Sequence, residues 1–171
     1  MNFLEKDLEQ IVYDADKELL AKKGLTINGK LIRQLRIGRY GIADLVEYKR
    51  PYYCKCLEGF VKGEIVVYEL KQNKIGISSF LQALGYLKGI KVYLKSKNIE
   101  ENYNYSIVLI GKELAKDSTY NYLTDFLSNS HNDIGIDAES SLSLYNYTYD
   151  YGLDGIQFKR QYNFQLVNSG F

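Results

Sequence analysis

Apolar residues recur at helical spacing in the first part of the chain. In residues 3–22 they fall three and four positions apart, which is the spacing of one face of an amphipathic helix. Asn2 stands where such a helix is capped, Glu5 follows three positions later as in a capping box, and Gly24 is placed to end the helix. The side chains expected to point inward are Leu4, Leu8, Ile11, Val12, Ala15 and Leu19.

The middle of the chain has the patterns of β-strands. Residues 31–37 and 41–48 flank a glycine-bounded turn and are expected to pair antiparallel. Residues 64–71 are mostly apolar and rich in β-branched and aromatic side chains, which is typical of a buried strand, here beside the 41–48 strand. Residues 52–62 fit either an extra strand or an irregular excursion. One face of the first strand would carry Leu31, Arg33, Leu35 and Ile37.

The second half of the chain predicts two more helices and three more strands. A helix is expected over residues 75–88, ended by Gly89, and another over residues 117–129. Residues 106–111 are wholly apolar, so we expect a central strand parallel to the 64–71 strand across the first of these helices. Ile77, Phe80, Leu81, Leu84 and Leu87 are expected to point inward from that helix.

Residues 141–151 alternate strictly, and a return strand is expected from Ile156 onward. The alternation places Tyr145, Tyr147, Tyr149 and Tyr151 on one face. Tyrosines could stack on bases, but an edge strand or a surface for a partner is the favoured interpretation. With no repeat or linker, the pattern predicts one α/β domain over residues 1–171, with a mixed central β-sheet flanked by α-helices.

Composition and charge change this picture little. The chain has 171 residues, is 46% hydrophobic and 25% charged, and carries a net charge of +1, which neither indicates nor excludes a nucleic-acid partner. No apolar run has the length of a membrane span, and the first residues lack the pattern of a signal peptide. We therefore expect an intracellular, cytoplasmic protein without a membrane partner. A local basic cluster, which solvated surface also explains, comprises Lys22, Lys23, Lys30, Arg33, Arg36 and Arg39.

The cysteines and the histidine carry little predicted chemistry. Cys54 and Cys56 are too close in sequence for an easy disulfide and lack a second ligand pair for zinc, so two reduced structural thiols are expected. His131 lies in a polar run with the character of a solvated loop, and no catalytic role is expected for it.

Charged residues interrupt the apolar pattern where the central strand ends. Glu69 and Lys71 project from the same face of the 64–71 strand, and Asp44 breaks the apolar run of its neighbour. Burying an acid and a base at the rim of a core is costly unless a function uses them. Converging carboxylates suit Mg²⁺, which activates water, and a nearby lysine can orient that water and offset developing charge.

The order of these residues resembles the PD-(D/E)XK nuclease superfamily: a helix with Glu, a strand with Asp, a strand with Glu-x-Lys and a helix with Gln. Within it, the chain most resembles NucS-type endonucleases and archaeal Holliday-junction resolvases. Two departures are Ala43, where the motif has proline, and the excursion at residues 49–63, which would reshape the approach of DNA. The segments that carry the resemblance are residues 5–9, 33–34, 39–45, 66–71 and 82–87.

The resemblance implies a restriction-endonuclease-like core and a Mg²⁺-dependent DNA endonuclease, with Mn²⁺ as a substitute metal. Asp44, Glu69 and the backbone carbonyl of Leu70 would ligate the metal, and Lys71 would position the attacking water. Glu5 would be the helical acid and a further ligand, with Glu9 as the alternative.

Further contacts to phosphate, water or nucleic acid would come from Gln82, Tyr86, Arg33, Arg36 and Arg39. The implied partner is DNA, in a branched, mismatched, single-stranded or duplex form, within DNA repair or recombination. A homodimer is also allowed, because junction-cutting relatives pair to cut two strands.

Simpler explanations exist for each residue. A cross-strand ion pair at the sheet edge would account for Glu69 and Lys71, a helix cap for Glu5, and solvated helix positions for Glu9 and Gln82. Two other functions also fit the pattern. One is a catalytically inactive DNA-binding or assembly module on the same fold, and the other is an RNA-processing nuclease.

Overall fold

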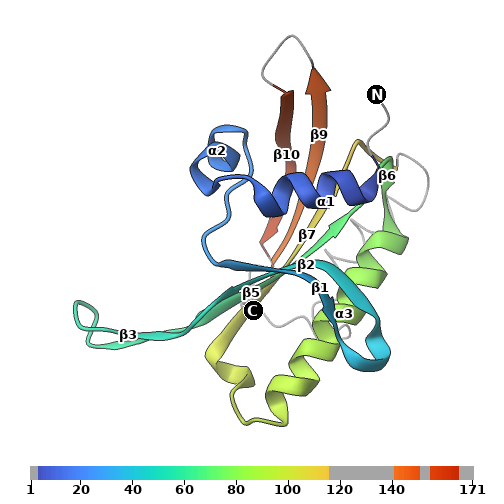
Figure 1. Cartoon of the computed structure of the whole chain (residues 1–171). Coiled ribbons are helices and arrows are strands. Elements are labelled where there is room, and N and C mark those ends of the chain that lie inside the picture. Colours follow the sequence, from blue (N-terminus) through green and yellow to red (C-terminus); the bar gives the residue numbers. More distant parts are fainter. Residues whose placement is uncertain (1–3, 116–140, 151–154, 166–171) are drawn as a thin grey trace, which may run out of the picture.

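A mixed six-stranded β-sheet forms the centre of the protein (Figure 1). The structure is a computed structural model that describes residues 4–115, 141–150 and 155–165. The strand order is β1-β2-β5-β7-β9-β10; β5, β7 and β9 run parallel, and the other neighbours pair antiparallel. The strands are β1 (Lys30–Arg36), β2 (Ile42–Lys49), β5 (Gly63–Leu70), β7 (Tyr103–Gly111), β9 (Ser141–Asp150) and β10 (Gly155–Gln165). The expected α/β class and the parallel and antiparallel pairings are confirmed.

The remaining described elements are helices and two small sheets. Strands β3 and β4 form an antiparallel hairpin, and β6 and β8 pair in parallel. The helices are α1 (Glu5–Asp14), α2 (Lys17–Lys22), α3 (Ile77–Lys95) and the short 3₁₀ helices η1 (Gly38–Tyr40) and η2 (Glu100–Asn102). The short strands are β3 (Tyr52–Cys54), β4 (Gly59–Val61), β6 (Lys74–Ile75) and β8 (Glu113–Leu114).

Alternating side chains of the central strands divide the core into two clusters on opposite faces of the sheet. The α3-side cluster joins Phe80 and Leu87 of α3 to Val67 of β5, whereas the α1-side cluster joins Leu8 of α1 to Tyr68. The helices α1 and α3 therefore cover different faces (Figure 1). This arrangement follows from the period-two alternation of a buried strand.

The first helical stretch is two helices, not one. Asp16 interrupts it because its carboxylate accepts hydrogen bonds from the backbone N–H groups of Glu18 and Leu19 and so caps α2. The break turns the second helix, and Leu19 is exposed while Leu20 is buried. Leu4 is also exposed, contrary to expectation. Asp7, rather than the expected Asn2 and Glu5 pair, satisfies the N-terminus of α1 by accepting from Leu4 N.

Strand β1 is kinked at Gln34. This residue has a φ of +50°, which a side chain with a Cβ rarely adopts, and it forms no Cα pair although its neighbours pair with Leu45 and Ala43. Leu31 packs against the α1-side cluster, while Leu35 packs against the α3-side cluster. The expected common face of this strand is therefore wrong, because the kink rotates its two halves.

Helix α3 continues through Gly89 to Lys95, so the expected stop at this glycine is wrong. A Cβ at position 89 would lie 2.5 Å from Cγ2 of Ile37 and 2.6 Å from Cδ2 of Tyr40. Gly89 thus allows close packing of α3 on the segment around η1. Leu81, expected inside, is 54% exposed.

The excursion at residues 49–63 is a hairpin of its own. Residues 55–58 form its turn, so Cys56 leaves the strand direction of Cys54, and the structure pairs the two as a disulfide with Cα atoms 5.4 Å apart. The expectation of two separate reduced thiols is wrong, because the turn brings the two side chains together despite their closeness in sequence.

Two other expectations concern the second half. Strand β9 lies between β7 and β10, so the expected edge strand is wrong. On its tyrosine face Tyr147 is 4% exposed and Tyr149 37%, and a partner surface there stays a prediction. The expected helix at 117–129, His131 and Tyr151 lie outside the described residues. Among the described helices, none combines the length and the apolar character needed to cross a bilayer.

Two glycines of α3 give a matched test of this packing. Gly89→Ala is expected to lower the free energy of unfolding by about 1–3 kcal/mol, because the new methyl group overlaps Ile37 and Tyr40. Gly85→Ala is expected to raise it by about 0.5–1 kcal/mol, because no atom lies within 4 Å of the new Cβ and alanine favours a helix. Denaturant unfolding measures both. Equal effects of the two substitutions would contradict the close contact at Gly89.

Candidate active site

The site forms where β2 and β5 separate. Their ladder runs from Lys49–Glu64 to Leu45–Tyr68 and goes no further. At the next position Oδ2 of Asp44 accepts a hydrogen bond from the backbone N–H of Leu70 at 3.1 Å. The side chain thus satisfies a donor that the ladder leaves unpaired. Charged side chains gather at this point: Lys71 lies close to Glu69, and the charges of Glu5 and Glu9 of α1 act on Asp44.

Glu69 is the most deeply buried acid of this site. Its side chain has no exposed surface, and Nζ of Lys71 lies 2.7 Å from its Oε1. This contact is an ion pair without regular hydrogen-bond geometry, and neither oxygen of Glu69 has a hydrogen-bond partner in the described part of the chain. Lys71 is fixed just beyond β5, because its backbone N–H donates to the carbonyl of Ile110 at 2.8 Å. The ion pair joins residues of one segment and is not cross-strand.

The electrostatics of the site disfavour negative charge on its acids. Burial raises the pKa of Glu69 to about 7. The contact with Lys71 lowers this pKa, and the negative charge of Asp44 raises it. Burial also raises the pKa of Asp44, although its hydrogen bond with Leu70 and the charge of Lys71 oppose the shift. Burial by itself lowers the pKa of Lys71, but the close contact with Glu69 and the negative charges of Glu69, Glu5 and Asp44 outweigh burial and raise this pKa. Lys71 therefore stays protonated.

Helix α1 brings two acids to the site in different surroundings. Glu5 is 49% exposed, and its Oε2 lies 3.6 Å from Nζ of Lys71. Glu5 therefore lies near Lys71 and does not cap α1. Glu9 is 5% exposed, and its negative charge raises the pKa of Asp44. Both expected positions for the helical acid thus face the same group of charges.

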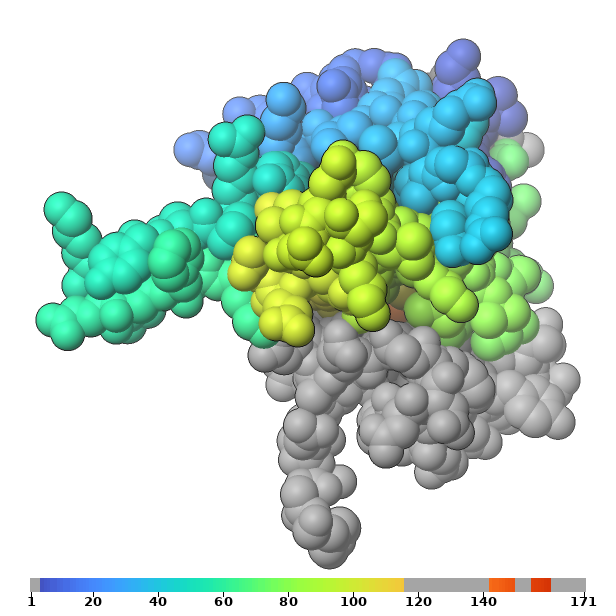
Figure 2. Space-filling view, turned by 90° about the horizontal axis from the view of Figure 1, so that it is seen from below, coloured from blue at the N-terminus to red at the C-terminus, as the bar shows by residue number. Residues whose placement is uncertain are grey.

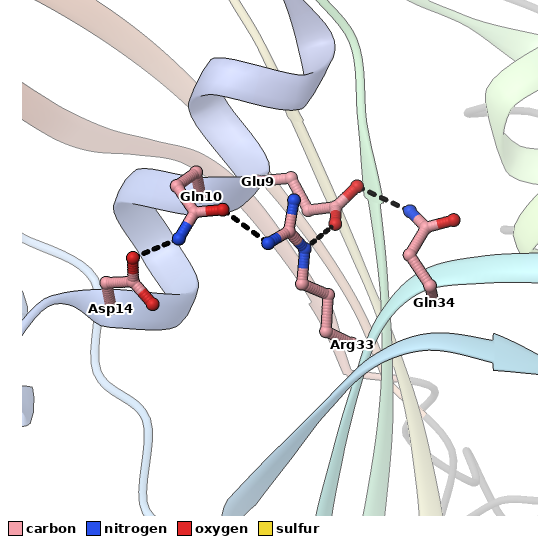
Figure 3. A network of polar contacts seen from close by, with 5 residues as sticks. All are labelled: Glu9, Gln10, Asp14, Arg33 and Gln34. Carbon is pink, nitrogen blue, oxygen red and sulfur yellow. Dashed lines mark hydrogen bonds and ion pairs between the residues drawn. The ribbon is translucent and has the colours of Figure 1, made fainter.

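Glu9 is also held in a network with β1 (Figure 3). Nε of Arg33 donates to its Oε1, and Nε2 of Gln34 donates to its Oε2 at 2.5 Å. Arg33 also donates to Gln10, which donates in turn to Asp14. The network anchors α1 to the kinked part of β1 and commits the oxygens of Glu9 to other partners. Glu5 is therefore the freer of the two acids.

The three arginines expected to contact nucleic acid lie in different surroundings. Arg33 is committed to Glu9, which leaves it little capacity for phosphate. Arg36 and Arg39 are exposed, and both line a mostly apolar cavity of about 630 Å³ between α3, η1 and the first two strands. The lining of that cavity includes none of Asp44, Glu69 or Lys71.

Gln82 and Tyr86 lie one turn apart on α3. Nε2 of Gln82 donates to the hydroxyl of Tyr86 at 2.8 Å. Tyr86 is 7% exposed, and its ring packs against Gly41. A Cβ added at position 41 would lie 3.0 Å from Cε1 of Tyr86. Gln82 is exposed. The ring of Tyr86 therefore cannot present a face to nucleic acid, and the residue positions Gln82 instead.

The donor set fits a hard divalent cation. Within residues 4–115, 141–150 and 155–165, no three His, Cys, Asp or Glu side chains gather in a group that would hold a metal by themselves. Magnesium, however, is usually bound by one or two carboxylates and keeps several waters. Asp44 and Glu69 supply two carboxylates, and the two oxygens of Glu69 are buried without hydrogen bonds. Unsatisfied buried oxygens of this kind call for a ligand.

Two contacts of this region were not predicted from the sequence. Gln34 reaches Glu9 only because of its unusual backbone, which no local pattern indicates. Tyr147 donates its hydroxyl to the carbonyl of Gln72 at 2.6 Å, next to Lys71 in sequence. Burial and the charge of Glu5 raise the pKa of Tyr147, which places it beside the site. The alternation of residues 141–151 predicted which strand face carries Tyr147, but not its hydrogen bond with Gln72.

A neutral residue at position 69 is expected to stabilise the metal-free protein at high pH. The pKa of Glu69 is raised on folding from 4.5 to about 7, so its contribution to stability is full below 4.5 and is lost as pH rises through 7. Glu69→Gln should therefore gain up to about 3 kcal/mol over the wild type at about pH 8 and almost nothing near pH 4.5. Thermal unfolding in a chelator at both pH values measures this.

Glu64→Gln is the matched control, because Glu64 lies on the same strand with 41% of its side chain exposed. It should change stability only slightly, because exposed ion pairs contribute little. A Glu69→Gln protein that is less stable than the wild type at about pH 8 would show that the carboxylate is well paired.

Comparisons of the chain with models of known protein families, with curated proteins and with solved structures found no match. The assignment of chemistry to this site therefore depends on the contacts described above.

Proposed function

We propose that this protein is a metal-dependent endonuclease that hydrolyses phosphodiester bonds in DNA. One observation carries the proposal: a fully buried glutamate with no hydrogen bond, an aspartate and a protonated lysine meet where two central strands diverge. This combination does not stabilise the core, because burying each charge lowers the free energy of unfolding. Perturbed carboxylates held together in this way are typical of functional sites.

The proposed metal ligands are Asp44, Glu69 and the backbone carbonyl of Leu70. Bound Mg²⁺ or Mn²⁺ would supply Lewis-acid polarisation of the phosphate and a lowered pKa for water. The hydrogen bond from Leu70 N fixes Oδ2 of Asp44, which leaves Oδ1 as the oxygen available to a cation. Glu69 contributes oxygens that have already lost their hydration.

Lys71 is proposed to act through its positive charge. Its raised pKa keeps the ammonium protonated, so it donates hydrogen bonds to an attacking water or to a phosphate oxygen and offsets developing negative charge. Glu5, at 3.6 Å from this ammonium, holds it on the solvent side. The exposed amide of Gln82 is proposed to contact phosphate or water at the margin of the site.

Cleavage of DNA in the presence of Mg²⁺ or Mn²⁺ tests the proposal. Asp44→Asn and Lys71→Ala should each reduce the cleavage rate by at least about 10²-fold, because each removes a group that acts on the reacting phosphate. Asp44→Asn keeps an oxygen for the N–H of Leu70, so the fold is retained. Glu64→Gln and Lys88→Ala, which change charges elsewhere, should cleave like the wild type. Linear, flapped and four-way DNA substrates should be compared, with matched RNA.

The outcomes separate the possible functions. Cleavage that persists in both Asp44→Asn and Lys71→Ala would show that the site assignment is wrong. Binding of Mn²⁺ and DNA without cleavage would favour an inactive nuclease-fold module. Preferred cleavage of the RNA substrates would identify an RNA-processing enzyme with the same chemistry.

The role of the helical acids is testable by metal titration. Glu5→Gln should weaken Mn²⁺ binding while leaving thermal stability almost unchanged, because Glu5 is half exposed. Glu9→Gln should lower the free energy of unfolding by about 1–3 kcal/mol, because it weakens the bonds with Arg33 and Gln34. Weaker Mn²⁺ binding in Glu9→Gln alone would make Glu9 the ligand.

A further inference from the structure

The β3–β4 hairpin extends away from the body of the protein (Figures 1 and 2). It carries large apolar side chains that remain in solvent: Phe60 is 80% exposed, Leu57 71%, Tyr53 54% and Tyr52 50%. Exposed aromatic side chains gathered on one projection mark an interaction site more often than a structural one. Neither core cluster includes any of these four residues.

The hairpin is built to present these rings in fixed positions. Tyr53 and Phe60 are directly opposite in the strand register, and their rings meet edge to face with centroids 5.6 Å apart. The disulfide between Cys54 and Cys56 lies at the turn that follows. Fixed rings lose little conformational entropy on binding, which favours their use as contacts.

The charges around the rings are mainly positive. Arg50 and Lys55 are exposed, Lys62 follows β4, and Glu58 in the turn is the one acid within residues 50–62. The chain as a whole is nearly neutral, so this basic character is local to the hairpin. A partner suited to it combines negative charge with flat aromatic surfaces.

We propose that the β3–β4 hairpin binds single-stranded nucleic acid by stacking unpaired bases on Phe60 and Tyr53, with the cations contacting phosphate. Bases stack on aromatic side chains independently of sequence, and basic residues follow the backbone. A duplex hides the faces of its bases within its own stack, so it gains only the electrostatic contacts. A second copy of this chain would use the rings but not the positive charge.

The hairpin joins the same two strands that carry the candidate active site. It follows the C-terminal end of β2 and precedes β5, whereas Asp44 and Glu69 lie toward the other ends, about 20 Å along the strands. This part of the inference rests on the proposed nuclease function: the hairpin would select substrates with unpaired bases for the site. Binding by the hairpin itself does not depend on cleavage and can be measured without it.

Fluorescence anisotropy with a labelled oligothymidylate tests the proposal. The intact chain is kept non-reducing and in a chelator, so that the disulfide persists and no cleavage occurs. The double variant Tyr53→Ala/Phe60→Ala should weaken binding by about tenfold or more, and Phe60→Trp should preserve it. Tyr93→Ala is the matched control, because Tyr93 is a 61% exposed aromatic residue on α3, and it should bind like the wild type.

Charge and strand state provide the second readout. Arg50→Glu/Lys55→Glu should weaken binding and make it less dependent on salt. A duplex should bind more weakly than the single strand and be unaffected by Tyr53→Ala/Phe60→Ala. Thermal unfolding checks that each variant is folded; the hairpin packs on neither core cluster, so little change is expected.

Unchanged single-strand binding in a folded Tyr53→Ala/Phe60→Ala protein would overturn the proposal. Equal losses for single strand and duplex would also overturn it, because stacking would then not be the cause. A wild-type dimer that becomes monomeric in this variant, without loss of oligothymidylate binding, would assign the surface to a second copy. Loss of cleavage in Asp44→Asn with unchanged oligothymidylate binding would separate the two proposals.

Discussion

Desolvation of the Glu69 carboxylate is the constraint on which the rest of this structure depends. The residue lies on a strand in the middle of the sheet, among side chains that exclude water, and its oxygens have an ion-pair partner but no aligned hydrogen bond. Such a group raises the free energy of the folded state whenever it is ionised. The surrounding apolar core must supply the stability that this acid removes, and it does so from both faces of the sheet.

The charged residues near Glu69 are assembled from three separate elements. Strand β2 supplies Asp44, the segment just after β5 supplies Lys71, and α1 supplies Glu5. Their relative positions depend on polar contacts, because the strand ladder ends before it reaches them. The network of Glu9, Arg33 and Gln34 holds α1 against β1 and so determines how near the helix comes to the lysine. Support of this kind around a group of charges is what precise positioning requires.

Much of the fold could be predicted from the sequence, because strand burial has a simple period. The apolar runs that became β5 and β7 were located within a few residues, and the parallel crossover between them followed from the intervening helix. The ion pair of Lys71 with Glu69 and the contact of Asp44 with the end of β5 agree with the sequence, in which these charged residues interrupt apolar runs. Their identity as metal ligands stays a prediction.

The features that escaped prediction depend on contacts distant in sequence or on single residues. Asp16 could equally have continued a helix, and only its capping bonds end α1 and begin α2. Gly89 has the sequence character of a helix stop, yet close contact with Ile37 and Tyr40 makes it part of the helix interior. The turn that brings Cys56 back toward Cys54 has no strong local signal. At Gly89 tertiary packing overrode local propensity.

The left-handed backbone of Gln34 also affects how the protein meets other chains. Strand β1 is at one border of the sheet, where a regular strand would offer an open row of N–H and C=O groups to a stray polypeptide. A residue with φ of +50° at its centre interrupts the regular spacing of that row. The same irregularity that directs an amide toward Glu9 therefore makes β1 a poor template for edge-to-edge aggregation.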